Sequence, residues 1–284
     1  MFLNFLETFF DYILDVLPYF LLASLVGAGL QSLFGSKLLR KDMLNSPLAP
    51  IATAVFGATI PVCSCSMIPL ARSMDSFSRS YAPVVAFLVT APVLSPVTLF
   101  LTFGMFGFQI TAFRFIFSFL FAVLLAYSVV LLFSKSATLP FLQGASGERK
   151  GKLSEFLKNF RSLTLSTGRY VLLGLLIASL LKVLVPQDLV LKFSGSFLSY
   201  PLTSLVSVPI YVCSGEEVPI AKSMYELGLK PGQSLTFMLA SSGICIPTIT
   251  ALLSFLPKRL VLLYSVSWFL FATVAGLITD YLLS

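Results

Sequence analysis

One fourteen-residue phrase occurs twice in this chain, and both copies interrupt strongly apolar sequence with polar residues. Residues 61–74 read PVCSCSMIPLARSM and residues 211–224 read YVCSGEEVPIAKSM, with seven identical positions at an offset of 150 residues. That offset is about half of the 284-residue length. Broken hydrophobic segments at matching places in two halves point to the substrate site of a secondary transporter. The repetition therefore predicts a duplicated membrane permease.

The composition indicates the class of protein. Hydrophobic residues make up 57% of the chain and charged residues 11%, whereas soluble domains carry roughly 25% charged residues. A membrane-spanning helix needs about 20 mostly apolar residues. Roughly eight such stretches can be marked, at 12–34, 48–70, 81–103, 109–133, 166–185, 197–221, 233–256 and 259–283. We therefore predict an all-α polytopic membrane protein of two homologous halves, with about 8–10 membrane helices, several of them broken or re-entrant.

The charge distribution predicts three regions and an orientation. Lys and Arg gather in the middle of the chain, so we expect a first transmembrane repeat over 1–134, a basic connection over 135–165 and a second repeat over 166–284. Cytoplasmic loops are enriched in Lys and Arg, which places the connection in the cytoplasm. Apolar residues at helical spacing within the connection suit an interfacial helix, and a solvated linker is the alternative. The net charge of +7 is thereby explained by topology, and no nucleic-acid partner is expected.

The same orientation bears on how the halves are related. With the acidic N-terminus outside and the connection inside, the first half crosses the membrane an odd number of times, which gives inverted repeats. Four plain crossings in each half would give parallel repeats. The inverted scheme therefore needs a hairpin or a pair of short crossings in each half. The candidates are the stretch 81–106, interrupted by TAPVLSP at 90–96, and its counterpart, interrupted at ASSGICIPT over 240–248.

The polar phrases resemble a known family. The Cys-Ser-Cys triplet at 63–65 followed by Pro69, and the VCS at 212–214 followed by Pro219, are similar to the predicted permease family that includes the organoarsenical efflux permeases (ArsP-type). The resemblance implies a polytopic inner-membrane exporter, with members associated with trivalent organoarsenicals and others with metal-ion efflux. Cys63, Ser64 and Cys65 match the family's thiol motif, whereas the second copy has Gly215 where the first has Cys65.

The cysteines are also candidates on chemical grounds. Thiolate sulfur is a soft ligand that suits soft acceptors such as Cu(I), and trivalent arsenic is similarly thiophilic. Cys63 and Cys65 would point about 200° apart on a regular helix, so both face one substrate only where the flanking prolines unwind the backbone. Packing as small apolar residues is the alternative, above all for Cys245. The candidate substrate-binding residues are Cys63, Ser64, Cys65, Cys213, Ser214 and Cys245.

Four charged residues in the second phrase and its counterpart suggest further roles. Acidic groups within membrane segments mark ion or proton paths, and the chain has no His, so Glu216 and Glu217 are the candidates for proton coupling. Capping of a half-helix is the alternative, because negative charge is favourable at a helix N-terminus. Arg72 and Lys222 occupy equivalent positions and are candidates for gating or charge pairing, with snorkelling to the interface as the alternative.

These features favour secondary-active export of a thiophilic substrate, with trivalent organoarsenicals first, by alternating access at the broken helices. Efflux of a copper or zinc ion, or of a small anion, is the alternative. An intramembrane enzyme would need a base, and His, the commonest one, is absent. An accessory membrane protein would not require polar interruptions in both halves. No P-loop is present, so a proton gradient is the expected energy source and no cofactor is expected.

Overall fold

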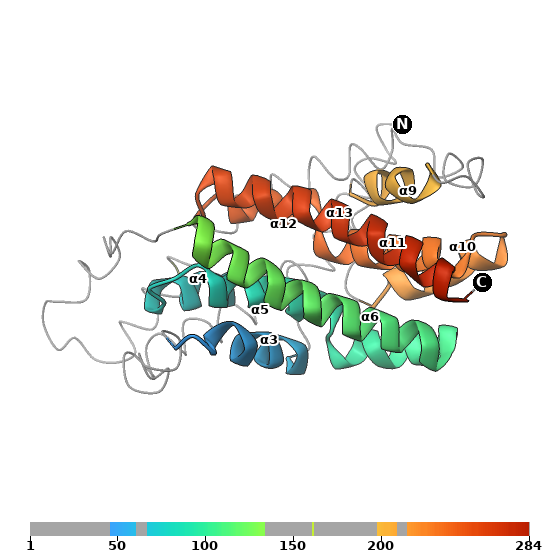
Figure 1. Ribbon diagram of the computed structural model, residues 1–284, viewed down its shortest axis with the longest axis horizontal. Coiled ribbons are helices and arrows are strands. Elements are labelled where there is room, and N and C mark those ends of the chain that lie inside the picture. Colours follow the sequence, from blue (N-terminus) through green and yellow to red (C-terminus); the bar gives the residue numbers. More distant parts are fainter. Residues whose placement is uncertain (1–45, 61–66, 134–160, 162–197, 209–214, 284) are drawn as a thin grey trace, which may run out of the picture.

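The computed structural model describes residues 46–60, 67–133, 161, 198–208 and 215–283 (Figure 1). Every element in these ranges is a helix, which confirms the all-α prediction for the described part of the chain. The helices are α3 (Ala49–Thr59), α4 (Met67–Phe77), α5 (Ala82–Val93), α6 (Pro96–Leu132), α9 (Ser199–Ser207), α10 (Glu217–Glu226), α11 (Pro231–Gly243), α12 (Ile246–Leu252) and α13 (Lys258–Leu283).

Some predictions fall elsewhere in the chain. The stretches 12–34 and 166–185 lie outside the described residues, and so does the connection over 135–165 except for Arg161.

Proline sets where most of these helices begin. It is tolerated at the first helical positions because the N–H groups there have no intrahelical acceptor. The first or second residue of five helices is a proline, namely Pro50, Pro83, Pro96, Pro231 and Pro247. Two of these prolines divide apolar stretches, so that α5 ends at Val93 and α11 ends at Gly243. Both interruptions lie in the segments that the sequence marks as broken.

Gly107 divides α6 into two arms. Its φ of 80° and ψ of −175° are not helical, and such a φ is readily adopted only by glycine. The first arm, residues 96–106, and the second, residues 108–132, fold back on each other (Figure 1). Arg114 Nη1 in the second arm donates to Thr102 Oγ1 in the first at 3.0 Å. Twelve residues of straight helix would separate these positions by about 18 Å, so α6 is a helical hairpin.

The four helices that flank residues 61–66 and 209–214 are each too short to cross a bilayer. α3 and α4 have 11 residues each, α10 has 10 and α9 has 9. Eleven residues of α-helix reach about 16 Å, about half of the roughly 30 Å hydrocarbon core. Each phrase therefore begins between two half-length helices and continues into the second of them, since 61–66 separates α3 from α4 and 209–214 separates α9 from α10.

Corresponding helices begin at nearly constant separation along the chain. α3 and α9, α4 and α10, and α6 and α12 begin 150 residues apart. The second arm of α6 and α13 lie beside each other and run in opposite directions (Figure 1). Between them the rings of Phe121 and Phe271, also 150 residues apart, stack at 4.1 Å between centroids. Antiparallel counterparts are what inverted repeats produce, so these observations favour the inverted arrangement, and the duplication itself stays a prediction.

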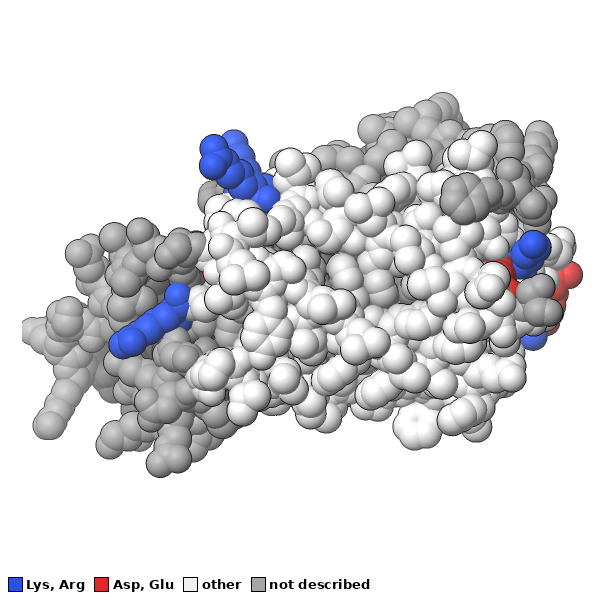
Figure 2. All heavy atoms as spheres, viewed as in Figure 1, with Lys and Arg blue, Asp and Glu red and all other residues white. Residues whose placement is uncertain are grey.

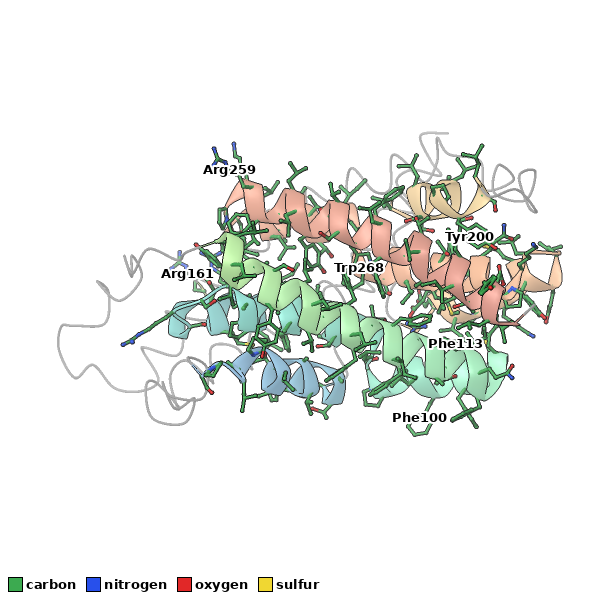
Figure 3. The ribbon with its side chains drawn as sticks, viewed as in Figure 1. Phe100, Phe113, Arg161, Tyr200, Arg259 and Trp268 are labelled. Atoms are coloured by element: carbon green, nitrogen blue, oxygen red, sulfur yellow. The ribbon has the colours of Figure 1, made fainter. Side chains whose placement is uncertain are left out.

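Trp268, the chain's one tryptophan, is the largest fully buried side chain of the described residues. Its ring is buried between α13 and the second arm of α6 (Figure 3). Trp268 meets Phe121 edge to face at 5.4 Å between centroids, and its Nε1 donates to the Leu239 carbonyl of α11 at 2.9 Å. The indole is therefore fixed by both aromatic packing and a hydrogen bond.

Glycines allow α11 to approach α13 closely. A Cβ atom built on Gly243 would lie 1.8 Å from Trp268 Cε2, and one on Gly276 would lie 1.9 Å from Thr236 Oγ1. Real Cβ atoms essentially never come that close to a neighbour. The contact between the two helices therefore depends on the absence of side chains at both positions.

The outer surface is that of a membrane protein. On the face shown in Figure 2, charged side chains lie only at the two ends, and the wide middle carries none. Large apolar side chains are exposed on α6 and α13, including Phe100 at 78%, Leu124 at 65% and Leu262 at 66%. Three helical segments of the described chain are long and apolar enough to span a membrane, Pro96–Leu132, Pro231–Leu252 and Lys258–Leu283. The chain is a polytopic integral membrane protein.

Asp280 of α13 anchors the beginning of α11. Its Oδ1 accepts from the Gly232 N–H at 2.7 Å, and its Oδ2 accepts from the Tyr200 hydroxyl. Tyr200 comes from α9 and points toward the C-terminal end of α13 (Figure 3). One carboxylate thus holds three helices of the second half together.

We expect Asp280→Ala to lower the free energy of unfolding by about 1.5–3 kcal/mol, the usual contribution of a hydrogen bond to a charged group. The midpoint of thermal unfolding, followed by the fluorescence of Trp268 in detergent, measures the loss. Tyr281→Ala is the matched control, because Tyr281 is 85% exposed. Equal midpoints for the two variants would show that Asp280 does not stabilise this junction.

Candidate functional site

A buried ion pair joins α6 to α10. Arg114 Nη2, in the second arm of α6, lies 2.8 Å from Oε1 of Glu217, the first residue of α10. The side chains are 0% and 1% exposed. The pair therefore connects the first half of the chain to the second within the apolar core.

Three further contacts orient the guanidinium of Arg114. Its Nε donates to the Val93 carbonyl at 3.1 Å, its Nη1 donates to Thr102 Oγ1 at 3.0 Å, and Nη1 also lies 3.5 Å from Met238 Sδ. Val93 is the last residue of α5, where carbonyl groups lack intrahelical donors and the helix dipole is negative. A fixed positive charge thus lies against the end of α5, at the break before α6.

The carboxylate of Glu217 has a second donor. Its Oε2 accepts from the Gly215 N–H at 2.5 Å. Gly215 has a φ of +106°, and a Cβ atom there would lie 3.3 Å from Leu101 Cδ1 in the first arm of α6. Glycine therefore allows both the backbone turn that aims this N–H and the close packing against α6. Negative charge is also favourable at the N-terminus of α10.

The surroundings make this ion pair costly. Arg114 is the only charged residue of α6, and α11 has none. Val218 and Met238 beside the pair are fully buried. A buried ion pair usually gains no stability over well-packed apolar residues of similar volume, and charges within membrane segments commonly mark transport or proton paths. The Arg114–Glu217 pair is therefore the leading candidate site in the described residues.

The chain has a second break between two helices, between α11 and α12. The contacts there resemble those at the break between α5 and α6, but a neutral side chain takes the place of Arg114. Tyr264 of α13 lies with its hydroxyl 3.3 Å from the Gly243 carbonyl at the end of α11 and 3.4 Å from the Leu88 carbonyl of α5. Cys245 is buried at the start of α12, and its Sγ lies 2.9 Å from Thr248 Oγ1. At the first break, Ser95 and Thr98 form the corresponding contact at 3.2 Å.

The numbering shows how closely the two breaks correspond. Tyr264 lies 150 positions after Arg114, and Gly243 lies 150 positions after Val93. Each side chain contacts the carbonyl of the last helical residue before the break in its own half, Val93 of α5 for Arg114 and Gly243 of α11 for Tyr264. The two breaks thus share an arrangement, but one holds a cation and the other a neutral hydroxyl.

The structure separates the two predicted coupling residues. Glu217 is buried in the ion pair, whereas Glu216, the N-cap of α10, is exposed. Adjacent residues on a helix point about 100° apart, so only one of them can face α6. Glu217 is thus the better placed of the two for a role inside the membrane.

The other predicted residues lie apart from the ion pair or outside the described residues. Lys222 Nζ lies 3.9 Å from Glu226 Oε1 and 5.6 Å from the ring centroid of Phe106. Arg72 is half-buried in α4. The residues Cys63, Ser64, Cys65, Cys213 and Ser214 are outside the described part, so their predicted role in substrate binding is untested. Among described residues, no group of three or more His, Cys, Asp or Glu side chains could hold a metal ion.

Arg114 was missed by the sequence interpretation, although a signal existed. It is the one charged residue within the apolar stretch 109–133. An isolated ionisable residue inside a membrane segment is a functional-site hypothesis by default. Its partner could not be read from the sequence, because Glu217 lies 103 residues away.

A family model described as ArsP_1, predicted permease, matches residues 1–281. The chain belongs to this predicted permease family. The match spans both breaks, both phrases and the ion pair of the permease, and it confirms the resemblance carried by the Cys-Ser-Cys triplet.

The relatives of the permease are distant and similar in length to it. A UPF0718 protein of Methanocaldococcus jannaschii is 23% identical over 98% of this chain and 95% of its own. The UPF0718 protein YcgR of Bacillus subtilis is 24% identical over 92% of each chain. A protein of Streptococcus mutans described as a putative two-component membrane permease complex subunit is 25% identical over 77% of this chain and 76% of its own. No solved structure matches the permease significantly.

Proposed function

We propose that this permease exports a small thiophilic substrate by alternating access, with trivalent organoarsenicals as the first candidates. The observation that carries the proposal is the buried Arg114–Glu217 pair, which lies where the broken α5–α6 segment meets the start of α10. The pair spans the two halves, so a motion of one half against the other would strain it. Alternating access consists of such a motion around a site at broken helices.

The substrate class rests on sulfur. Cys63, Ser64 and Cys65, which match the family's thiol motif, fall in the short segment of sequence between α3 and α4. Two thiols suit the two open positions of a monomethyl trivalent arsenic species, and soft acceptors prefer sulfur to oxygen ligands. Cys213 and Ser214 occupy the corresponding segment before α10. The proposal therefore assigns substrate binding to the two phrases.

The proposal also includes the energy source of transport and the orientation of the protein in the membrane. Glu217 exchanges a proton during the cycle, and the gradient across the inner membrane drives export. The basic connection over 135–165 faces the cytoplasm, since cytoplasmic loops are enriched in Lys and Arg. In everted vesicles the exporter would therefore accumulate substrate from the bath.

The first test is uptake of trivalent methylarsenic by everted vesicles. We expect uptake by the native protein in a proton gradient and its loss in Cys63→Ser/Cys65→Ser, because serine oxygen does not replace a soft thiolate. Ser66→Ala in the same segment is the matched control and should retain uptake. Full uptake by the double cysteine variant would eliminate the thiol mechanism.

A separate variant tests whether Glu217 couples transport to the proton gradient. We expect Glu217→Gln to bind substrate but to lose the dependence of uptake on the gradient, since glutamine keeps the side-chain shape but cannot exchange a proton. Binding of the arsenical to purified protein, compared with gradient-driven uptake in vesicles, distinguishes the two effects. Unchanged gradient dependence in Glu217→Gln would exclude this residue as the proton carrier.

A further inference from the structure

The guanidinium of Arg114 is oriented by groups other than Glu217. The Val93 carbonyl and the Thr102 hydroxyl accept from Nε and Nη1. Thr102 itself is fixed, because its hydroxyl donates to the Thr98 carbonyl at 2.7 Å. Nη2, which faces Glu217, would therefore keep its direction if the carboxylate moved away.

The place that the Glu217 carboxylate occupies is shaped to receive an anion. One oxygen meets Nη2 of Arg114 and the other meets the N–H of Gly215, two residues before the first residue of α10. Guanidinium groups and backbone N–H groups are common donors to carboxylates and oxyanions. The space is small, because a single added carbon at Gly215 would already touch Leu101.

The buried charge of Arg114 needs a compensating negative charge, which Glu217 supplies. Among the elements packed against α10, α6 offers Arg114 alone and α11 offers no charge. On and before α10 itself, the other titratable residues are exposed or half-buried, namely Glu216, Lys222, Tyr225 and Glu226. If Glu217 became neutral, Arg114 would be an uncompensated buried cation, which is strongly unfavourable. A second anion would restore neutrality.

We propose that Arg114 and the Gly215 N–H form a binding site for a small monovalent carboxylate or similar oxyanion, which enters when Glu217 takes up a proton. Proton and anion arrive together, so the net charge of the core is the same before and after. The Glu217 carboxylate binds these two donors until the anion displaces it. The inference rests on the proton exchange assigned to Glu217 under the proposed function, and it adds a ligand that the arsenical mechanism does not require.

Formate is the probe, because it is the smallest carboxylate. In purified Glu217→Ala the resident carboxylate is gone, and we expect sodium formate to raise the midpoint of thermal unfolding in a saturable manner. The expected rise is roughly 3–6 °C for each tenfold excess over the dissociation constant, compared with sodium chloride at equal ionic strength. Glu226→Ala, at an exposed position of the same helix, is the matched control and should show a smaller formate-specific rise, because formate must there displace the Glu217 carboxylate.

The native protein gives an independent measurement that does not depend on a variant folding. Adding formate to weakly buffered purified protein should cause uptake of as many protons as formate ions bound, and Arg114→Gln/Glu217→Gln should show neither. Absence of a formate-specific rise in folded Glu217→Ala, an equal rise in Glu226→Ala, or formate binding without proton uptake would overturn the site. Gradient-driven arsenical uptake reports separately on coupling, so failure of the anion site and failure of the proposed function are distinguishable.

Discussion

Arg114→Met should strongly destabilise the folded protein. The change leaves the carboxylate of Glu217 buried without its cation, a loss that typically costs about 3–5 kcal/mol. Native proteins are stable by only about 5–15 kcal/mol, so the variant should unfold well below the native midpoint. Yield after detergent extraction and the Trp268 fluorescence midpoint measure the effect. Glu226→Gln, which disturbs only an exposed ion pair at 3.9 Å, is the control and should match the native protein.

The double variant Arg114→Met/Glu217→Leu distinguishes stability from function. Removing both charges leaves no uncompensated ion, and apolar residues of similar volume often restore or raise stability. We therefore expect a folded protein that no longer couples export to the gradient. If the double variant is as unstable as Arg114→Met, the hydrogen bonds of Arg114 to Val93 and Thr102 account for its contribution. If it exports normally, the ion pair has no part in transport.

The second large effect is expected from Gly243→Ala. The new methyl group would overlap the Trp268 ring, whose nearest atoms lie 1.8 Å away. The ring cannot withdraw easily, because Phe121 packs against it and its Nε1 is bonded to the Leu239 carbonyl. Overpacking of a core costs about 1–3 kcal/mol or more, and this overlap should reach the upper end. Monodispersity and thermal aggregation in detergent are the measurements.

Gly104→Ala is the control for Gly243→Ala, because it makes the same substitution where there is free space. No atom lies within 4 Å of a Cβ built on Gly104, and alanine is favoured over glycine in helices by about 0.5–1 kcal/mol. This variant should be as stable as the native protein or slightly more so. Combining Gly243→Ala with Trp268→Leu should recover part of the loss by removing the ring. A stable Gly243→Ala single variant would mean that α11 and α13 can move apart freely.

The positions of the helix breaks could be predicted because they depend on local chemistry. Pro96 and Pro247 cannot continue a preceding helix, and the sequence alone places an interruption before each. The turn at Gly107 falls between the marked stretches 81–103 and 109–133, and the structure confirms a connection there. The sequence did not predict that the chain reverses direction at Gly107, because a glycine in apolar sequence can equally serve to let two helices pack closely.

The site was only partly predictable because it depends on packing between distant segments. An acidic pair in a broken segment was enough to nominate Glu216 and Glu217. Choosing between them required the rotation of α10 about its axis, which its contacts with α6 and α11 determine. Cys245 is the N-cap residue of α12, as Ser95 is of α6, and this correspondence became visible only when the two breaks could be compared.

The stacked rings of Phe121 and Phe271 illustrate how the sequences of the two halves can diverge during evolution. In a symmetric pair of identical chains, a residue at the twofold axis meets its own copy, and one codon specifies both sides of the contact. Under the predicted duplication two codons specify them, and each half is free to diverge. Arg114 and Tyr264 illustrate that freedom, since a cation stands in one half where a hydroxyl stands in the other. A charge at that position in both halves would bring two cations into one core, and fusion of the halves permits just one.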